Sequence, residues 1–499
     1  MEHRAGRLGS ILLSGIERRK DISISSMHQL KKAAAFFLLV ALSAAAAPKS
    51  QAETRYLLFQ IFTSAGSPYQ ALGGTTTLKE IPDRASIQLF ARSIKDRIGT
   101  TGDKSSKLGI ALGPIALDHA DQQVKSLIRD SFAVARALDM AVALHLDDSI
   151  FWSLHSDLRN AKGHVEWSDW KGTETTGRRL DWGPEPKKVA PQLCFNSLPV
   201  LKAVRERASL IGREIMAEYR LLKEEGREHL FAGVITGWET MMSKDFESGR
   251  ALGYCALKNA GYDRNQPPRD LNAARAAVVK EFMELWAASI RKEGVPAQLI
   301  YNHIAFTAQG LSGNTYDHPP GDTAFSGQYR PGLSTYPTPG TFKDIYALLK
   351  RHDNPPWASV EGTNVVPNGQ PGEKTMESYL GRMFNHGAVM VNIFAWGLGE
   401  NNLQRNFFRR ATEGPEPIAA YQRFLSGEPL REDSAQLFDP TELQNKIHDI
   451  QARLPLWVQR TRRQRDAEVI MRRLESHLQS RNLASANEAA DEALKLLEQ

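Results

Sequence analysis

Two glutamates each follow a short apolar run of the kind that forms a buried strand. Glu239 comes directly after the run 231–238, and Glu361 comes directly after the run 357–360. Burying an isolated carboxylate is costly, so a strand that ends on one usually opens into a polar cleft. Two carboxyl groups in one cleft can cleave a glycosidic bond, because one donates a proton while the other attacks the sugar or activates water.

Further polar side chains follow other apolar runs. His145, Asp147 and Asp148 lie at the end of the third run, and Asn302 and His303 lie within the fifth. We interpret them as groups that bind sugar hydroxyls, with Asp148 as a reserve acid. Two alternatives stay open: the aspartates cap the following turn, or they join the histidines in a metal site, which needs at least three ligands. We predict no metal and no cofactor.

Tryptophans gather near the same strand ends. Trp152 and Trp182 lie in the long loop after the third run, while Trp238 and Trp396 follow the fourth and eighth runs. Indole rings stack on the apolar faces of pyranoses, so these four residues are candidate sugar contacts. The alternative is that they pack the core of the loop itself.

Eight apolar runs alternate with amphipathic helical stretches, which is typical of parallel strands covered on both faces. The runs are 56–62, 108–115, 140–146, 231–237, 299–306, 333–336, 357–360 and 388–395. This pattern predicts an α/β fold, a TIM (β/α)8 barrel with a long loop after the third strand. A doubly wound open sheet is the rival, but the turn 63–67 is a poor match to its glycine-rich phosphate loop.

In a TIM barrel the carboxyl ends of the strands form the active-site face. With Glu239 after strand four and Glu361 after strand seven, the chain resembles the clan A glycoside hydrolases over about residues 55–400. The resemblance implies a retaining mechanism with Glu239 as acid/base and Glu361 as nucleophile. It also implies that Tyr336 hydrogen-bonds the nucleophile and that Trp396 forms the floor under the sugar.

One position departs from the clan pattern. Many members have asparagine directly before the acid/base, where it binds the sugar 2-hydroxyl, and here that position is Trp238. Asn302 or His303 could supply the missing contact.

The N-terminus has the features of a signal peptide. Lys31 and Lys32 precede the apolar run 33–47, and small residues favour cleavage before Glu53. We therefore expect export to the periplasm or medium and no stable membrane insertion after cleavage. Residues 1–52 carry eight Lys or Arg and three Asp or Glu, which accounts for +5 of the formal +6. The remaining chain is nearly neutral and gives no reason to expect a nucleic-acid partner.

Three regions follow from these patterns: an N-terminal extension with signal peptide (1–52), the barrel (53–412) and a small all-helical appendage (413–499). Export would permit a disulfide between Cys194 and Cys255, although sequence cannot show whether they are close enough. The preferred function is an exported glycoside hydrolase with a carbohydrate substrate. The alternatives are a non-catalytic carbohydrate-binding barrel and a metal-dependent hydrolase. The sequence does not indicate an oligomeric state.

Overall fold

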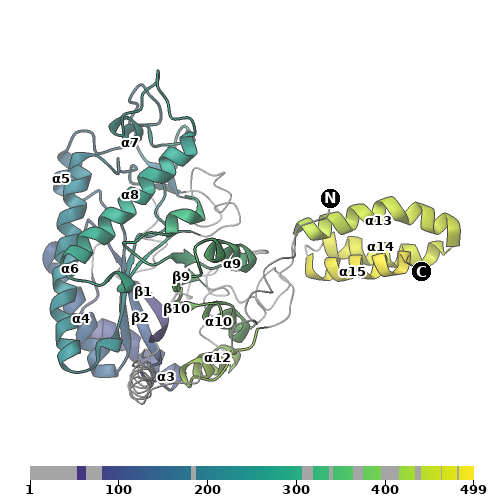
Figure 1. Cartoon of the computed structure of the whole chain (residues 1–499), viewed down its shortest axis with the longest axis horizontal. Helices are drawn as coiled ribbons and strands as arrows, with labels where there is room; N and C mark the ends of the chain where they lie inside the picture. The colour runs from purple at the N-terminus through teal and green to yellow at the C-terminus, as the bar shows by residue number, and fades with distance from the viewer. Residues whose placement is uncertain are drawn as a thin grey trace, which may run out of the picture. The chain divides into compact units, whose positions relative to one another are not determined.

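The computed structural model describes residues 53–62, 81–180, 187–305, 319–336, 341–362, 375–394, 415–432, 440–461, 463–479 and 483–498. The chain divides into two units, Met1–Glu53 and Thr54–Gln499. The second unit contains an eight-stranded parallel sheet with helices around it, which is the predicted TIM barrel (Figure 1).

Each predicted apolar run forms one barrel strand. The strands are β1 (Arg55–Phe62), β2 (Ser106–Ile115), β3 (Ala141–Leu146), β6 (Phe231–Thr236), β7 (Ile300–Asn302), β8 (Gly332–Ser334), β9 (Trp357–Gly362) and β10 (Ala388–Ile393). Their spatial order is β7-β6-β3-β2-β1-β10-β9-β8. Backbone hydrogen bonds beyond the end of β7 join it to β8, where Ser334 N donates to the Ile304 carbonyl at 2.9 Å. The two outer strands of the list are therefore neighbours, and the barrel closes.

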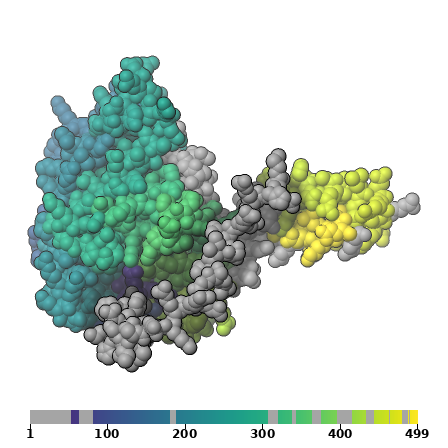
Figure 2. All heavy atoms as spheres, viewed as in Figure 1, coloured from purple at the N-terminus to yellow at the C-terminus, as the bar shows by residue number. Residues whose placement is uncertain are grey.

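Amphipathic helices form the outer layer. They are α3 (Arg84–Ile98), α4 (Asp121–Leu138), α6 (Leu198–Glu224), α8 (Leu271–Lys292), α9 (Thr341–Arg351), α10 (Met376–Phe384) and α12 (Pro415–Leu425). Asp83 and Asp270 cap α3 and α8 through their side chains, which satisfies amide groups that have no partner within the helix. In Figure 2 the side chains of this layer fill much of the visible barrel surface.

Side chains alternate between the two faces of each strand, as expected for β structure. The outward-facing side chains pack against the helices in one large apolar cluster. The inward-facing cluster combines alanines, among them Ala111 and Ala143, with larger side chains such as Tyr56, Tyr301 and Met390. The narrow interior is thus packed with side chains, as in other TIM barrels.

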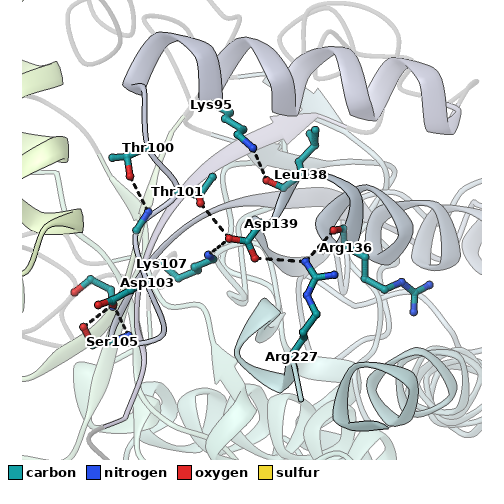
Figure 3. A network of polar contacts seen from close by, with 12 residues as sticks. Lys95, Thr100, Thr101, Asp103, Ser105, Lys107, Arg136, Leu138, Asp139 and Arg227 are labelled. Atoms are coloured by element: carbon teal, nitrogen blue, oxygen red, sulfur yellow. Dashed lines mark hydrogen bonds and ion pairs between the residues drawn. The ribbon is translucent and has the colours of Figure 1, made fainter. Parts of the chain in front are cut away.

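An ion pair between a buried lysine and a half-exposed aspartate lies near the N-terminal end of β2, away from the strand ends that carry the glutamates. Lys107 is 2% exposed, and its Nζ lies 2.6 Å from Oδ2 of Asp139. Asp139 ends α4 in a left-handed conformation and also contacts Thr101 and Arg227 (Figure 3). Because this is the end of the barrel opposite the active-site face, we assign the network to stability.

The predicted end of the barrel at residue 412 is too early. Helix α12 packs into the barrel core: Tyr421 stacks edge-to-face on Phe59 of β1, with ring centroids 5.2 Å apart, and Phe424 stacks on Phe384 of α10. The helical pattern after residue 413 therefore begins with a helix of the barrel. Helices α13 (Pro440–Thr461), α14 (Gln464–Gln479) and α15 (Leu483–Leu497) pack on one another around a core of their own.

The long loop after β3 holds α5 (Ser156–Asn160) and the antiparallel pair β4 (Arg178–Leu180) and β5 (Lys187–Val189). Cys194 of this loop contacts Cys255 of α7 (Tyr254–Asn259), which follows β6; the two sulfur atoms lie 2.7 Å apart, and both residues are free cysteines in the structure. Among the residues that the structure describes, no helix is long and apolar enough to cross a membrane.

Candidate functional site

Glu239 lies at the carboxyl end of β6, three residues beyond the last strand residue. Gly237 and Glu239 both have positive φ angles, of 94° and 58°. The left-handed conformation is unfavourable for a residue with a side chain and costs about 1–3 kcal/mol. Such strained residues are concentrated at functional sites. Here the two positive φ angles redirect the backbone after β6, so that the half-buried Glu239 side chain leaves the strand direction.

Glu361 lies at the carboxyl end of β9 and owes its direction to a β-bulge. In the pairing with β8, Leu333 lies opposite Ser359 but Ser334 lies opposite Glu361, so β9 contains one extra residue. In a regular strand, Glu361 would face the same side as Ser359, whose hydroxyl contacts Thr335. A bulge re-aims the side chains beyond it, and Glu361 is brought to the same face as Ser334.

The two glutamates are held by neighbouring residues of β8 and its end. Ser334 Oγ lies 3.1 Å from Oε1 of Glu239, and Tyr336 Oη donates to Oε1 of Glu361 at 2.7 Å. Ser334 also pairs with Glu361 across the strands, and the charge of Glu239 acts on Glu361, so the ends of β6 and β9 bring the two carboxyl groups near each other at the barrel mouth.

Glu361 is 7% exposed, and its Oε2 has no hydrogen-bond partner among the described residues. Burial raises the pKa of Glu361 well above its usual value, and the negative charge of Glu239 raises it further, whereas the Tyr336 hydrogen bond lowers it. A carboxyl group whose pKa depends on a second carboxyl is typical of catalytic acid pairs.

A layer of polar side chains fills the barrel interior directly beneath the glutamates. His145 and His303 are fully buried and bond to each other, with 3.0 Å between Nε2 of His145 and Nδ1 of His303. The remaining nitrogen of His145 bonds to Gln60, and that of His303 bonds to Ser334. Burial lowers the pKa of His303 to about 3 and the pKa of His145 well below its usual value, so both rings are neutral.

These contacts correct the expectation that the two histidines bind sugar. Every ring nitrogen of His145 and His303 already has a protein partner, and neither ring reaches the surface. Asn302 is corrected as well, since it is fully buried. It accepts from Gly332 N at 2.6 Å and approaches the sulfur of Met283 in α8, on the outer side of the sheet.

The aspartates after β3 are nearly fully buried. Oδ1 of Asp147 accepts from Ser149 N at 2.9 Å and from Ile150 N at 2.7 Å. Asp147 thus caps the turn after β3, which was one of the alternatives that the sequence left open. Asp148 accepts from the hydroxyls of Thr240 and Ser149. Burial, followed by the charge of Asp148, raises the pKa of Asp147 to about 7. Both aspartates thus brace the loops around Glu239.

The tryptophans occupy different environments. Trp152 is 3% exposed and donates to the Pro191 carbonyl at 2.9 Å, so it packs the core of the loop. The expectation that Trp152 contacts the sugar is therefore wrong. Trp238 is 5% exposed and packs on His145, with ring centroids 4.2 Å apart. It forms an apolar wall beneath Glu239. Trp182 and Trp396 lie outside the described residues.

Three residues of the site were not predicted from the sequence: Gln60, Ser334 and Asn392. Gln60 interrupts the apolar run of β1 after Arg55, Asn392 interrupts that of β10, and both are fully buried. A lone amide at an inward-facing strand position was the available signal. Within the described part of the chain, no group of three or more His, Cys, Asp or Glu is arranged to hold a metal ion.

No family model matches the chain, and no curated protein matches its sequence. Among solved structures, it is similar to the catalytic domain of β-amylase from Paenibacillus polymyxa, with 10% identity, a TM-score of 0.46 and coverage of 75% of this chain and 99% of that one. It is also similar to the endo-β-1,4-mannanase from Thermotoga petrophila, with 9% identity, a TM-score of 0.42 and coverage of 77% and 79%. A broad-specificity endoglucanase from an uncultured bacterium matches with 8% identity, a TM-score of 0.37 and coverage of 75% and 93%. All three TM-scores lie below 0.5, so no property of these proteins is assigned to this chain.

Proposed function

We propose that the protein is a glycoside hydrolase in which Glu239 is the general acid/base and Glu361 is the nucleophile. The observation that carries the proposal is the convergence of two carboxyl groups from different strands at the mouth of the barrel. They are linked through Ser334, which contacts one glutamate and pairs in register with the other. Glycosidic bond cleavage requires two acids at one cleft, and this convergence supports the proposal.

In the proposed first step, Oε2 of Glu361 attacks the anomeric carbon as the bond to the leaving oxygen breaks. Glu239 transfers its proton to that oxygen. In the second step, water attacks the anomeric carbon, Glu239 takes up a proton from the water, and the bond to Glu361 breaks. Both steps pass through states with positive charge on the sugar, which the nearby carboxylate stabilises.

Tyr336 supports the nucleophile in this mechanism. Its hydroxyl donates to Oε1 of Glu361, so Oε2 is the oxygen left to react. We keep Trp182 and Trp396 as proposed sugar-stacking residues. We also propose that residues 1–52 direct export, which N-terminal sequencing of the mature protein would test: the expected first residue is Glu53.

The test uses a panel of aryl glycosides with Glu361→Gln and Glu239→Gln, and Glu206→Gln as control. Glu206 is an exposed glutamate of α6 that pairs with Lys202. We expect Glu361→Gln to abolish hydrolysis. Removing general acid catalysis costs about 10²–10⁴-fold, so we expect Glu239→Gln to lose that much on substrates with basic leaving groups and far less on activated ones.

Three outcomes would contradict the proposal. Equal activity of both variants and the control would remove the glutamates from the chemistry. Sugar binding without hydrolysis by the wild-type protein would favour the non-catalytic barrel. Hydrolysis that EDTA abolishes and the glutamate substitutions leave intact would favour the metal-dependent alternative.

A further inference from the structure

Five inward-facing polar side chains form one continuous line of hydrogen bonds beneath the proposed acid/base. We call this line the polar chain, and it consists in order of Asn392, Gln60, His145, His303 and Ser334. All five residues are between 0% and 2% exposed. In such an interior the partners cannot be replaced by bulk water, so the direction of each hydrogen bond is set by the next one.

The far end of the polar chain is fixed by a backbone group. Nδ2 of Asn392 donates to the Val360 carbonyl at 2.8 Å, and a carbonyl can only accept. The same amide nitrogen donates to Oε1 of Gln60 at 2.9 Å. Nε2 of Gln60 donates to the Ile61 carbonyl at 3.2 Å, which independently requires the same orientation of the Gln60 amide. Oε1 of Gln60 is therefore the atom that faces His145.

This orientation selects the tautomer of both histidines. Because Oε1 of Gln60 only accepts, Nδ1 of His145 carries the proton in their 3.0 Å contact. A neutral ring then has a lone pair on Nε2, so Nδ1 of His303 must donate to it at 3.0 Å. Nε2 of His303 is in turn an acceptor. The Gly237 carbonyl also faces both rings. The proton on Nδ1 of His303 is therefore shared between that carbonyl and Nε2 of His145.

The hydrogen bond between His303 and Ser334 determines the protonation state of Glu239. Nε2 of His303 accepts from the hydroxyl of Ser334 at 2.8 Å. A serine has one proton, and this contact uses it. In the 3.1 Å contact between Ser334 Oγ and Oε1 of Glu239, the carboxyl group must then be the donor.

We propose that the polar chain holds the catalytic proton on Glu239 in the resting enzyme, with Ser334, His303 and His145 as positioning residues. This inference rests on the proposed function, because it assigns the acid of that mechanism. The other glutamate meets the opposite hydrogen-bond polarity, since Tyr336 donates to Glu361 and stabilises its ionised form. Two like acids at one mouth are thus separated into a proton donor and a carboxylate.

The charged and titratable groups that face Glu239 agree with this assignment. Among the described residues, Glu361 from β9 repels Glu239 when both carboxyl groups are ionised. One proton is therefore favoured on the pair, and the hydrogen bonds with Ser334 and Tyr336 assign it to Glu239. His303 from β7 and His145 from β3 are neutral and place no positive charge beside it. Asp148 is bound by the hydroxyls of Thr240 and Ser149.

The first test is the pH dependence of kcat/KM in Ser334→Ala, with the aryl glycoside that the wild-type protein cleaves best. A group that accepts from the acid stabilises its neutral form and raises its pKa. Removing Ser334 should therefore lower the pKa of the acid and move the alkaline limb of the profile to lower pH by about 0.7 unit, the equivalent of one neutral hydrogen bond. The control is Ser131→Ala, which removes a buried hydroxyl from α4 that bonds to the Ile128 carbonyl; its profile should match that of the wild type.

The sign of the shift decides between the two directions of the polar chain. If Ser334 donated to an ionised Glu239, its removal would raise the pKa and move the alkaline limb to higher pH. A shift in that direction, or no shift relative to the control, would overturn the proposal.

The second test needs no catalytic activity. Selective ¹⁵N labelling of histidine in the wild-type protein reports the tautomer of each ring by NMR, with His145→Gln and His303→Gln used for assignment. The proposal requires both rings to be neutral with the proton on Nδ1. An Nε2–H tautomer or an imidazolium at either position would overturn it. If the NMR result holds while no glycoside is cleaved, the proposed function fails and the polar chain stands as a structural feature.

Discussion

The hydrogen bond between Tyr336 and Glu361 gives the sharpest prediction about catalysis. Tyr336 Oη donates to Oε1 of Glu361 at 2.7 Å, inside a site where the carboxyl is 7% exposed. A hydrogen bond to a charged group contributes about 1.5–3 kcal/mol. Each pKa unit corresponds to about 1.4 kcal/mol, so Tyr336→Phe should raise the pKa of Glu361 by about 1–2 units.

In the proposed mechanism Glu361 must be ionised to attack, so this rise in its pKa has a defined effect on activity. The acid limb of kcat/KM should move to higher pH by the same 1–2 units, and activity on the acid side should fall about 10–100-fold. The assay is the pH profile of an aryl glycoside, measured for the variant and the wild type in parallel.

Tyr346→Phe is the matched control. Tyr346 of α9 also donates its hydroxyl at 2.7 Å, but to the Arg382 carbonyl in the outer layer. We expect it to lose stability without moving the acid limb. An unchanged acid limb in Tyr336→Phe, or one at lower pH, would refute the role of Tyr336 and the ionised state assigned to Glu361.

Three further predictions concern stability. Burial raises the pKa of Glu166 from 4.5 to about 7. The folded protein therefore binds a proton at Glu166 more tightly than the unfolded protein does. The resulting contribution to the free energy of unfolding is fully present below pH 4.5 and is lost as the pH rises to about 7. Glu166→Gln should remove that part of the pH dependence, up to about 3 kcal/mol in denaturant unfolding at a series of pH values, and an identical slope would contradict it. The proposed export predicts that Cys194 and Cys255 become oxidised to a disulfide, so titration of the unfolded protein should find no free thiol. Replacing both with serine should then cost about 4 kcal/mol for a loop of 61 residues; two titratable thiols would contradict this. Lys107→Met should cost about 1–3 kcal/mol, because it leaves Asp139 without its closest partner while Asp139 stays half exposed; a fall in kcat/KM without a fall in melting temperature would contradict its assignment to stability.

The sequence carried enough information for the barrel because its strands are apolar runs of strand length. Each of the eight predicted runs coincides with a strand, since burial on both faces leaves a continuous signal. The positions of Glu239 and Glu361 followed from the same signal, because a carboxylate directly after a buried strand is unusual.

What the sequence did not reveal depends on register and packing. The bulge that turns Glu361 inward is a difference in pairing between β8 and β9, and no residue type marks it. Asn302 and His303 are adjacent in sequence but face opposite sides of β7, so only one of them joins the polar chain. The helical pattern around Tyr421 gave no indication that α12 packs against β1.

The separation of the carboxyl groups of Glu239 and Glu361 in a crystal structure of the protein would test the central claim most directly. A retaining pair of acids stands about 5–5.5 Å apart, and this is the distance that we predict. A distance of about 6.5–9.5 Å would contradict the role of Glu361 as nucleophile and favour inversion. Carboxyl groups that point away from a common space would contradict the glycosidase altogether.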